Sequence, residues 1–283
     1  MGQAILRVLA RGTRHVPEIP VDALAHEFAL LRAEGLVKDY GGLRAVDGFS
    51  ATIRPNELVG LIGPNGAGKT TVFNLLTGLE RPDAGEIRLN NYVISGLAPH
   101  AISHRGLSRT FQNVRLLKNL SVLENVKIAY HQHIRYNLAD SILRTRRFRR
   151  EEREIERRSV EFLEIFGLAD ERDQPASSLP YGLQRKLEIA RALATESRLL
   201  LLDEPAAGMN PRETGEMMDL IREIKDRFDL SILLIEHDMK LVMNICRRII
   251  VLDAGKIIAT GRPDEIRRNP AVIEAYLGKD FGA

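Results

Sequence analysis

The chain has 283 residues, of which 44% are hydrophobic and 28% charged, and its formal net charge is only +3. The chain can therefore bury one large core or two modest ones, and its small charge surplus does not indicate a nucleic-acid-binding protein. No apolar run approaches the roughly 18–20 residues of a membrane-spanning helix. We expect a soluble protein whose single Cys246, which excludes an internal disulfide bond, is a small buried side chain on a helix.

The N-terminal residues differ from the rest of the chain. Residues 1–30 contain three arginines and a short apolar run that Arg7 interrupts, so they do not resemble a secretory signal. We expect an extension of unknown role. From about Leu31, apolar segments of strand length alternate with turn signals.

A strand, a glycine-rich loop and a helix are predicted in that order over residues 57–79. Four apolar residues of the helix have helical spacing: Val72, Leu75, Leu76 and Leu79. Later apolar runs at residues 198–203, 230–235 and 247–252 are rich in Ile, Leu and Val and alternate with helical patterns. This alternation favours an α/β fold with a mostly parallel sheet covered on both faces.

Between residues 113 and 178 the pattern is different, with no strand-like run, few turn signals and many helix formers. We interpret this stretch as a mostly helical insertion. The segment Arg144–Arg158 within it contains eight arginines and four glutamates. A solvated helix face held by salt bridges is the simplest interpretation, and contact with a membrane surface or an acidic partner is the alternative.

Residues 178–193 predict a turn followed by a helix. Four residues have the spacing of one buried face: Leu183, Leu187, Ala190 and Ala194. Three charged residues are expected off that face: Arg185, Lys186 and Glu188. Pro180 and Gly182 are predicted just before the helix, whose first N–H groups would then be free to bind an anion.

Residues 63–70 read GPNGAGKT and fit the phosphate-binding pattern G-x-x-x-x-G-K-[ST] between a strand and a helix. Its glycines allow the backbone N–H groups to surround a phosphate chain. Lys69 would place a positive charge at the β- and γ-phosphates, Thr70 is a candidate magnesium ligand, and Thr71 would reach the α-phosphate. The nucleotide-binding candidates of this loop are Gly63, Pro64, Asn65, Gly66, Ala67, Gly68, Lys69, Thr70 and Thr71.

The apolar run Leu199–Leu202 ends in two adjacent carboxylates. Asp203 is a candidate ligand of magnesium, and Glu204 is placed to polarise a water molecule toward the γ-phosphate. A solvated turn is the alternative explanation of adjacent acids, but the phosphate loop upstream argues against it.

Three further side chains have weaker signals. His237 follows an apolar strand, where it could be structural or could hydrogen-bond the γ-phosphate and the attacking water. Gln112 lies between the sheet region and the helical insertion and could reach the magnesium ion or that water. Tyr40 precedes a Gly-Gly turn and could stack on an adenine ring or be an ordinary surface tyrosine.

Together these residues resemble the nucleotide-binding subunit of ATP-binding-cassette (ABC) transporters, over about residues 31–261. The matching features follow in the family's order: an aromatic loop with Tyr40, the phosphate loop, a glutamine loop with Gln112, a signature turn at residues 179–183, the strand ending in Asp203 and Glu204, and a switch histidine, His237. The resemblance implies a P-loop NTPase core, with a mostly parallel sheet, an antiparallel β subdomain and an inserted α-helical subdomain, and implies ATP and Mg²⁺ as cofactors. The ATPase domain would span residues 31–268 with the helical subdomain at about 113–185, and residues 269–283 would form a C-terminal helical tail.

The resemblance also implies roles for these residues. Glu204, His237, Lys69 and Gln112 would be catalytic. Thr70, Gln112 and Asp203 would bind the metal, and Tyr40 would stack on the base. A signature turn would cap the ATP held by a partner subunit in a head-to-tail dimer; its residues are Pro180, Tyr181, Gly182, Leu183 and Gln184.

Two features depart from the family pattern. Residues 179–183 read LPYGL in place of L-S-G-G-Q, so that a serine hydroxyl and one backbone N–H are missing. We expect the helix N-terminus, the Tyr181 hydroxyl or Gln184 to hold the γ-phosphate instead. Asn210 stands where the family has an aspartate, and it could still hydrogen-bond across the dimer interface without a charge.

Several phrases, including RTFQNVRLLKNLSVLENV and NPAVIEAYLG, are similar to the larger ATP-binding subunit of branched-chain amino-acid importers. This implies a Mg-dependent ATPase at the cytoplasmic face of the inner (plasma) membrane. Its partners would be a second ABC ATPase subunit in a homo- or heterodimer, two transmembrane permeases and, indirectly, a substrate-binding protein. Urea, amides or other amino acids are alternative substrates, and a soluble non-transport ABC ATPase is the remaining alternative. No nucleic-acid partner is expected.

Overall fold

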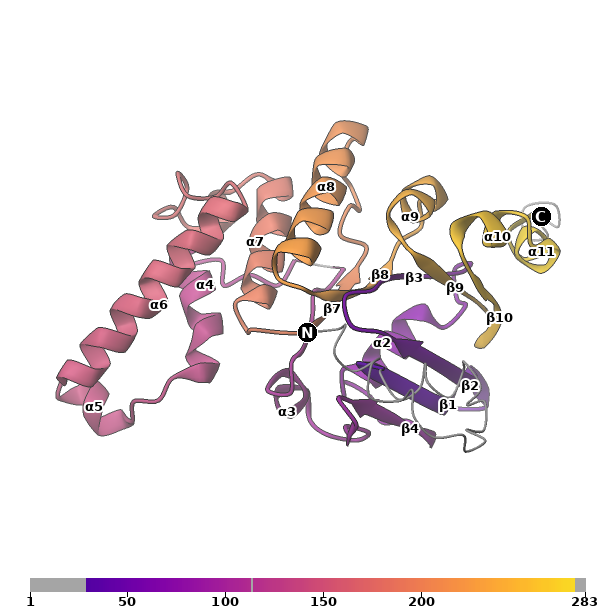
Figure 1. Cartoon of the computed structure of the whole chain (residues 1–283), viewed down its shortest axis with the longest axis horizontal. Helices are drawn as coiled ribbons and strands as arrows, with labels where there is room; N and C mark the ends of the chain where they lie inside the picture. Colours follow the sequence, from indigo (N-terminus) through magenta and orange to yellow (C-terminus); the bar gives the residue numbers. More distant parts are fainter. Residues whose placement is uncertain (1–28, 113, 278–283) are drawn as a thin grey trace, which may run out of the picture.

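The computed structural model describes residues 29–112 and 114–277, and Figure 1 shows two sheets flanked by helices, with a group of helices projecting to one side. The predicted N-terminal extension lies outside the described residues except for its last two positions. The predicted α/β fold class, with a parallel core sheet, an antiparallel sheet and a helical insertion, is confirmed.

The core sheet has six strands in the order β10-β9-β3-β8-β7-β6. All pairs are parallel except β9 with β10. The strands are β3 (Leu58–Ile62), β6 (Leu107–Arg109), β7 (Leu199–Asp203), β8 (Ser231–Ile235), β9 (Arg248–Asp253) and β10 (Lys256–Gly261).

Both faces of the central strands β3, β7 and β8 are buried, which explains their continuous apolar runs. In β7, Leu200 and Leu202 pack into a core with helices on one face, whereas Leu199 and Leu201 pack into a second core on the other face. The helices of the first face are α7 (Tyr181–Leu193), α8 (Pro211–Arg227) and α9 (Met239–Ile245). The second face is covered by α2 (Lys69–Leu76) and by the antiparallel sheet (Figure 1).

The antiparallel sheet has the order β2-β1-β4-β5. Its strands are β1 (Leu31–Tyr40), β2 (Leu43–Ile53), β4 (Ala84–Leu89) and β5 (Tyr92–Val93). A short helix α3 (Pro99–Ser103) leads from this sheet to β6. The helix that was predicted to continue to Leu79 ends earlier, because Gly78 adopts a positive φ of 71° after the C-cap Thr77 and leaves Leu79 exposed beyond the helix end.

The helical subdomain inserts between β6 and β7. Its elements are α4 (Val122–Tyr130), η2 (His131–His133), α5 (Leu138–Ile142), α6 (Arg146–Ile165), η3 (Ala176–Ser178) and α7. A capping box of Ser121 and Glu124 starts α4, and the Thr145 hydroxyl caps α6. Buried Val126, Leu163 and Leu187 belong to the core that also covers the sheet, so the subdomain is packed onto it.

The last helices of the described residues are α10 (Pro263–Arg267) and α11 (Pro270–Leu277), the latter within the predicted C-terminal tail. Cys246 directly follows α9 instead of lying on it, and it is buried near Gly60, where an added Cβ would lie 3.1 Å from its sulfur. Burial raises the pKa of the Cys246 thiol well above its usual range. Among the described helices, none combines the length and the apolar character needed to cross a membrane.

Candidate nucleotide site

The phosphate loop connects β3 to α2. An added Cβ at Gly63 would lie 2.0 Å from the Leu252 carbonyl oxygen, and one at Gly68 would lie 2.4 Å from the Ala45 carbonyl oxygen. The loop is therefore pressed against neighbouring backbone, and these two positions require glycine. Lys69 Nζ donates to the carbonyl oxygens of Gly63 at 2.7 Å and Pro64 at 2.9 Å. This brings its charge over the loop at the start of α2, where the first N–H groups have no partner within the helix.

Gly68→Ala is expected to disrupt this loop. Gly68 has φ 101°, and its added Cβ would collide with the Ala45 carbonyl, so we expect a cost of about 1–3 kcal/mol in the free energy of unfolding and loss of nucleotide binding. Thermal unfolding with and without ATP measures both effects. Gly215→Ala in α8 is the matched control, because nothing lies within 4 Å of its added Cβ, and it should be neutral or stabilising. Equal stabilisation of both variants by ATP would contradict the prediction.

Three predicted catalytic side chains meet at one edge of the core sheet. Glu204 follows β7, and its carboxylate lies between Gln112 Nε2, 3.0 Å from Oε2, and His237 Nε2, 2.5 Å from Oε1. The reason is topological: β6, β7 and β8 are adjacent and parallel, so the residues after their carboxyl ends lie together. Lys69 is positioned by β3, the next strand along the sheet.

The Glu204 backbone is strained as well as buried. Its φ is 49°, a left-handed conformation that costs a non-glycine residue about 1–3 kcal/mol, and its side chain is 11% exposed. Its N–H donates to the Ile235 carbonyl. This bond to the end of β8 holds the carboxylate beside His237.

Asp203 has a partner that the sequence analysis missed. Arg109 Nη2 lies 2.7 Å from Asp203 Oδ2, and Arg109 Nη1 donates to Asn74 Oδ1 in α2 at 2.7 Å. The guanidinium carbon lies 5.3 Å from the Phe73 ring centroid and 5.1 Å from that of Phe111. Arg109 thus joins the phosphate-loop helix to the predicted metal ligand, and its Nε is buried without a hydrogen-bond partner. The sequence carries no signal for this pair, because the two residues are 94 positions apart and the neighbourhood of β6 and β7 is known only from the folded sheet.

A second missed residue is Glu236. It accepts N–H bonds from Ala206 and His237, and burial raises the pKa of its carboxyl, with the Glu204 charge adding to the increase. Glu236 therefore fixes the backbone at Ala206, two residues after Glu204, and at His237. A charged residue at the end of the apolar run ILLI was the signal in the sequence.

The predicted signature helix differs from expectation in two ways. Its first residue is Tyr181, with Pro180 as N-cap, so Gly182 lies inside the first turn and not before the helix. Arg185 and Glu188, expected off the buried face, are both buried. The reason is the segment carrying Gln112, which packs against this side of α7.

Arg185 and Glu188 clamp that segment. Arg185 donates to the Phe111 carbonyl at 2.6 Å and to the Gln112 carbonyl, and it pairs with Glu188 at 3.1 Å. Glu188 accepts from the N–H groups of Phe111 and Arg115. Burial raises the pKa of Glu188 even though these partners oppose the shift. The buried pair therefore fixes the backbone from which the Gln112 side chain extends.

The remaining signature residues already have partners within the chain. The Tyr181 hydroxyl accepts from Arg185 Nε at 2.9 Å, and Gln184 Nε2 donates to the Leu179 carbonyl at 2.8 Å. Among the described residues, no hydrogen bond joins the signature turn to the phosphate loop. Leu183, expected on the buried face, is only half-buried.

Tyr40 stands apart from these groups. It ends β1, is 42% exposed and has Lys38 Nζ 5.5 Å from its ring centroid. Its ring is accessible for stacking, and among the described residues no hydrogen bond joins Tyr40 to the phosphate loop.

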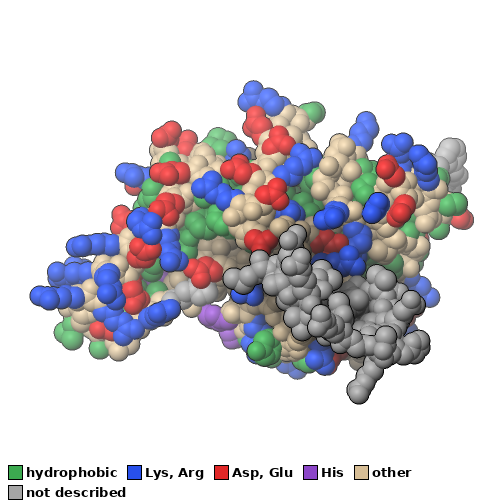
Figure 2. Space-filling view, in the orientation of Figure 1, with side chains coloured by type: hydrophobic (Ala, Val, Ile, Leu, Met, Phe, Trp, Pro, Cys, Tyr) green, Lys and Arg blue, Asp and Glu red, His purple; other side chains and the backbone are tan. Residues whose placement is uncertain are grey.

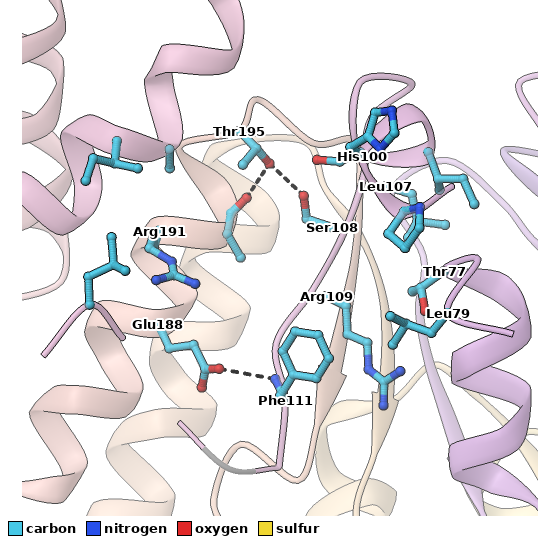
Figure 3. A pocket seen from close by; sticks show the side chains of 17 residues that line it. Thr77, Leu79, His100, Leu107, Ser108, Arg109, Phe111, Glu188, Arg191 and Thr195 are labelled. Atoms are coloured by element: carbon cyan, nitrogen blue, oxygen red, sulfur yellow. Dashed lines mark hydrogen bonds between the residues drawn. The ribbon is translucent and has the colours of Figure 1, made fainter. Parts of the chain in front are cut away.

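A groove of about 500 Å³ lies between α3, β6, α4 and α7, next to the residues that hold Asp203 and the Gln112 segment (Figure 3). Its labelled side chains come from both the core and the helical subdomain, and they include Arg109, Phe111, Glu188 and Arg191. Burial lowers the pKa of the Arg191 guanidinium. The groove wall thus contains Arg109, which pairs with Asp203, and Glu188, which holds the Gln112 segment.

Comparisons with known proteins identify the family of the chain. A family model described as ABC transporter matches residues 46–207, and one described as branched-chain amino acid ATP-binding cassette transporter matches residues 256–282. The high-affinity branched-chain amino acid transport ATP-binding protein LivG of Salmonella typhimurium is 49% identical over 250 residues, which cover 88% of this chain and 98% of LivG. BraF of Pseudomonas aeruginosa, with the same description, is 47% identical with the same coverage.

Among solved structures, the ADP conformation of MJ1267, an ATP-binding cassette of an ABC transporter, superposes with a TM-score of 0.76. It is 32% identical, and the match covers 88% of this chain and 99% of MJ1267. The resemblance noted in the sequence is thereby confirmed. Because the ABC transporter model matches residues 46–207 and relatives such as LivG are almost half identical over most of its length, the chain belongs to the ABC transporter family.

Proposed function

We propose that this chain is the ATP-binding and ATP-hydrolysing subunit of an ABC importer for branched-chain amino acids. The observation that carries the ATPase assignment is the convergence of Gln112, Glu204 and His237 beside the phosphate loop. The substrate assignment is supported by the likeness to LivG and BraF and by the C-terminal match over residues 256–282.

The residues present fit MgATP. Thr70 is exposed on the first turn of α2, and Asp203 and Gln112 supply a carboxylate and an amide oxygen, the hard ligands that Mg²⁺ prefers. Within residues 29–112 and 114–277 no group of three or more His, Cys, Asp and Glu side chains could hold a metal by itself. This suits Mg²⁺, which is usually held by one or two carboxylates together with substrate phosphates. When bound, the ion would neutralise charge on the β- and γ-phosphates.

The roles of the catalytic residues follow from their contacts. The Glu204 carboxylate would accept the proton of the water that attacks the γ-phosphate, while Gln112 and His237 orient that carboxylate and the water. Lys69 would stabilise the negative charge that develops on the transferred phosphoryl group. Glu236 and Arg185 would act as positioning residues through the backbone bonds described above.

The subunit is proposed to work as one half of a dimer at the cytoplasmic face of the inner membrane. The signature turn Pro180–Gln184 would face the γ-phosphate held by a second cassette subunit, identical or different. The groove beside Phe111 and Arg191 would receive a helix of a permease, and two permeases would connect the dimer to a substrate-binding protein. The groove fits this role because its walls include Arg109, which pairs with Asp203, and Glu188, which holds the Gln112 segment. A helix bound there would contact residues that position the nucleotide site.

Co-purification from native membranes with this chain as bait tests the assignment. We expect two hydrophobic permeases and a second cassette subunit, and we expect ATP hydrolysis by the recovered complex to increase when leucine-loaded binding protein is added. Recovery of ribosomes or DNA-associated proteins without a permease would overturn the transport assignment and leave the ATPase chemistry standing.

A further inference from the structure

The far tip of the helical subdomain has exposed apolar side chains. Leu138 is 77% exposed, Ile142 72% and Leu143 74%, which are the largest values among the large hydrophobic residues in the described part of the chain. Leu138 and Ile142 are four residues apart on α5 and therefore share one helix face. We call residues 138–153 the tip.

The tip also has an unbalanced charge. It contains six arginines against three acidic residues, a surplus of three that equals the formal net charge of the whole chain. The predicted salt-bridged face is found mainly toward the other end of α6, where Arg157 and Arg158 both pair with Glu154. On the tip, Arg147 pairs with Glu151. Five exposed arginines have no side-chain partner among the described residues: Arg144, Arg146, Arg149, Arg150 and Arg153.

Figure 2 shows these features together, with several Lys or Arg side chains and hydrophobic side chains at the outer end of the helical subdomain. An acidic protein partner would explain the arginines but not three neighbouring apolar side chains that are each more than 70% exposed. A cationic surface with exposed leucine and isoleucine side chains is typical of segments that lie at the interface of an anionic bilayer.

The position of the tip agrees with this chemistry. Ile128 and Ala129 near the end of α4 line the groove, and only the turn through η2 separates α4 from α5. Gln132 holds that turn to the core by accepting from Ser103 and donating to the Thr195 carbonyl. In Figure 1, α3 beside the groove and α5 lie on the lower side of the molecule, opposite α8 and α9. A permease in the groove would therefore place the bilayer on the side of the tip.

We propose that the tip binds the anionic lipid surface of the membrane, an inference that rests on the proposed function for the direction of the bilayer. The unpaired arginines contact lipid phosphates, to which a guanidinium can donate two hydrogen bonds, and Leu138, Ile142 and Leu143 enter the headgroup region. The contact supplements docking to the permeases and leaves the nucleotide site untouched.

Flotation of the purified full chain with vesicles tests the proposal. We expect binding to vesicles of 70% phosphatidylcholine and 30% phosphatidylglycerol, no binding to pure phosphatidylcholine, and loss of binding at high salt because exposed charges are screened. Arg149→Gln/Arg150→Gln/Arg153→Gln and, separately, Leu138→Ser/Ile142→Ser should each weaken binding about tenfold. Wild-type binding that is equal for the two vesicle types, or absent, would overturn the proposal.

Matched controls separate the tip from the rest of the chain. Arg157→Gln/Arg158→Gln removes paired arginines from the same helix, and Leu43→Ser removes an exposed apolar side chain in β2 that is 69% exposed. Both should bind as the wild type does, and tip variants that bind as well as these controls would also overturn the proposal. Tip variants should hydrolyse ATP normally. A wild-type chain that binds anionic vesicles but hydrolyses no ATP would contradict the proposed ATPase function and leave the proposed lipid binding by the tip standing.

Discussion

Glu204→Gln is expected to lower the rate of ATP hydrolysis by about 10²–10⁴-fold while ATP still binds. The amide is nearly isosteric with the carboxylate but cannot accept the proton of the attacking water. Its contacts to Gln112 and His237 occupy the same positions, so the phosphate loop should be unaffected. With hydrolysis blocked, ATP and Mg²⁺ should hold two cassette subunits together.

Steady-state ATPase assays and sedimentation velocity with saturating MgATP measure the two effects. Glu223→Gln, on the exposed side of α8, removes a carboxylate of the same kind away from the site and should leave both measurements unchanged. Hydrolysis within threefold of the wild type would contradict the assignment of Glu204 as the base. If the variant stays monomeric alone, the same measurement with the co-purified second cassette decides whether the dimer is heteromeric.

Arg109→Met is expected to destabilise the protein by about 3–5 kcal/mol, because it leaves the buried Asp203 carboxylate without its ion partner. Chemical denaturation measures the loss. The variant should also need more Mg²⁺ for ATP binding, because Asp203 loses the group that orients its carboxylate. Titration of Mg²⁺ with a fluorescent ATP analogue in the Glu204→Gln background measures this separately from turnover.

The double variant Arg109→Met/Asp203→Asn is the control for this prediction. Removing both charges should restore much of the stability, since a neutral pair does not carry the cost of one uncompensated buried charge. A single Arg109→Met variant within about 1 kcal/mol of the wild type, or a double variant no more stable than the single, would show that the ion pair does not stabilise the fold. Unchanged Mg²⁺ dependence would exclude a positioning role for Arg109.

The sequence by itself determined the local parts of the site. The strand, phosphate loop and helix around Gly63–Leu76 are contiguous, and the apolar run ending in Asp203 and Glu204 is contiguous as well, so periodicity and glycine spacing were sufficient. The helical insertion was predictable for the same reason. The end of α2 was predicted too late, because apolar spacing continues to Leu79 although Gly78 has already ended the helix.

Only the tertiary structure decided what these parts contact. Periodicity separates the apolar positions of α7 from the charged ones, but it does not show that the Gln112 segment covers the charged side and buries Arg185 and Glu188. The Arg109–Asp203 pair spans 94 positions of the chain and the Gln112–Glu204 bond spans 92. Both exist because packing on two faces of the sheet sets β6, β7 and β8 side by side, and strand order is a non-local property that no residue spacing encodes.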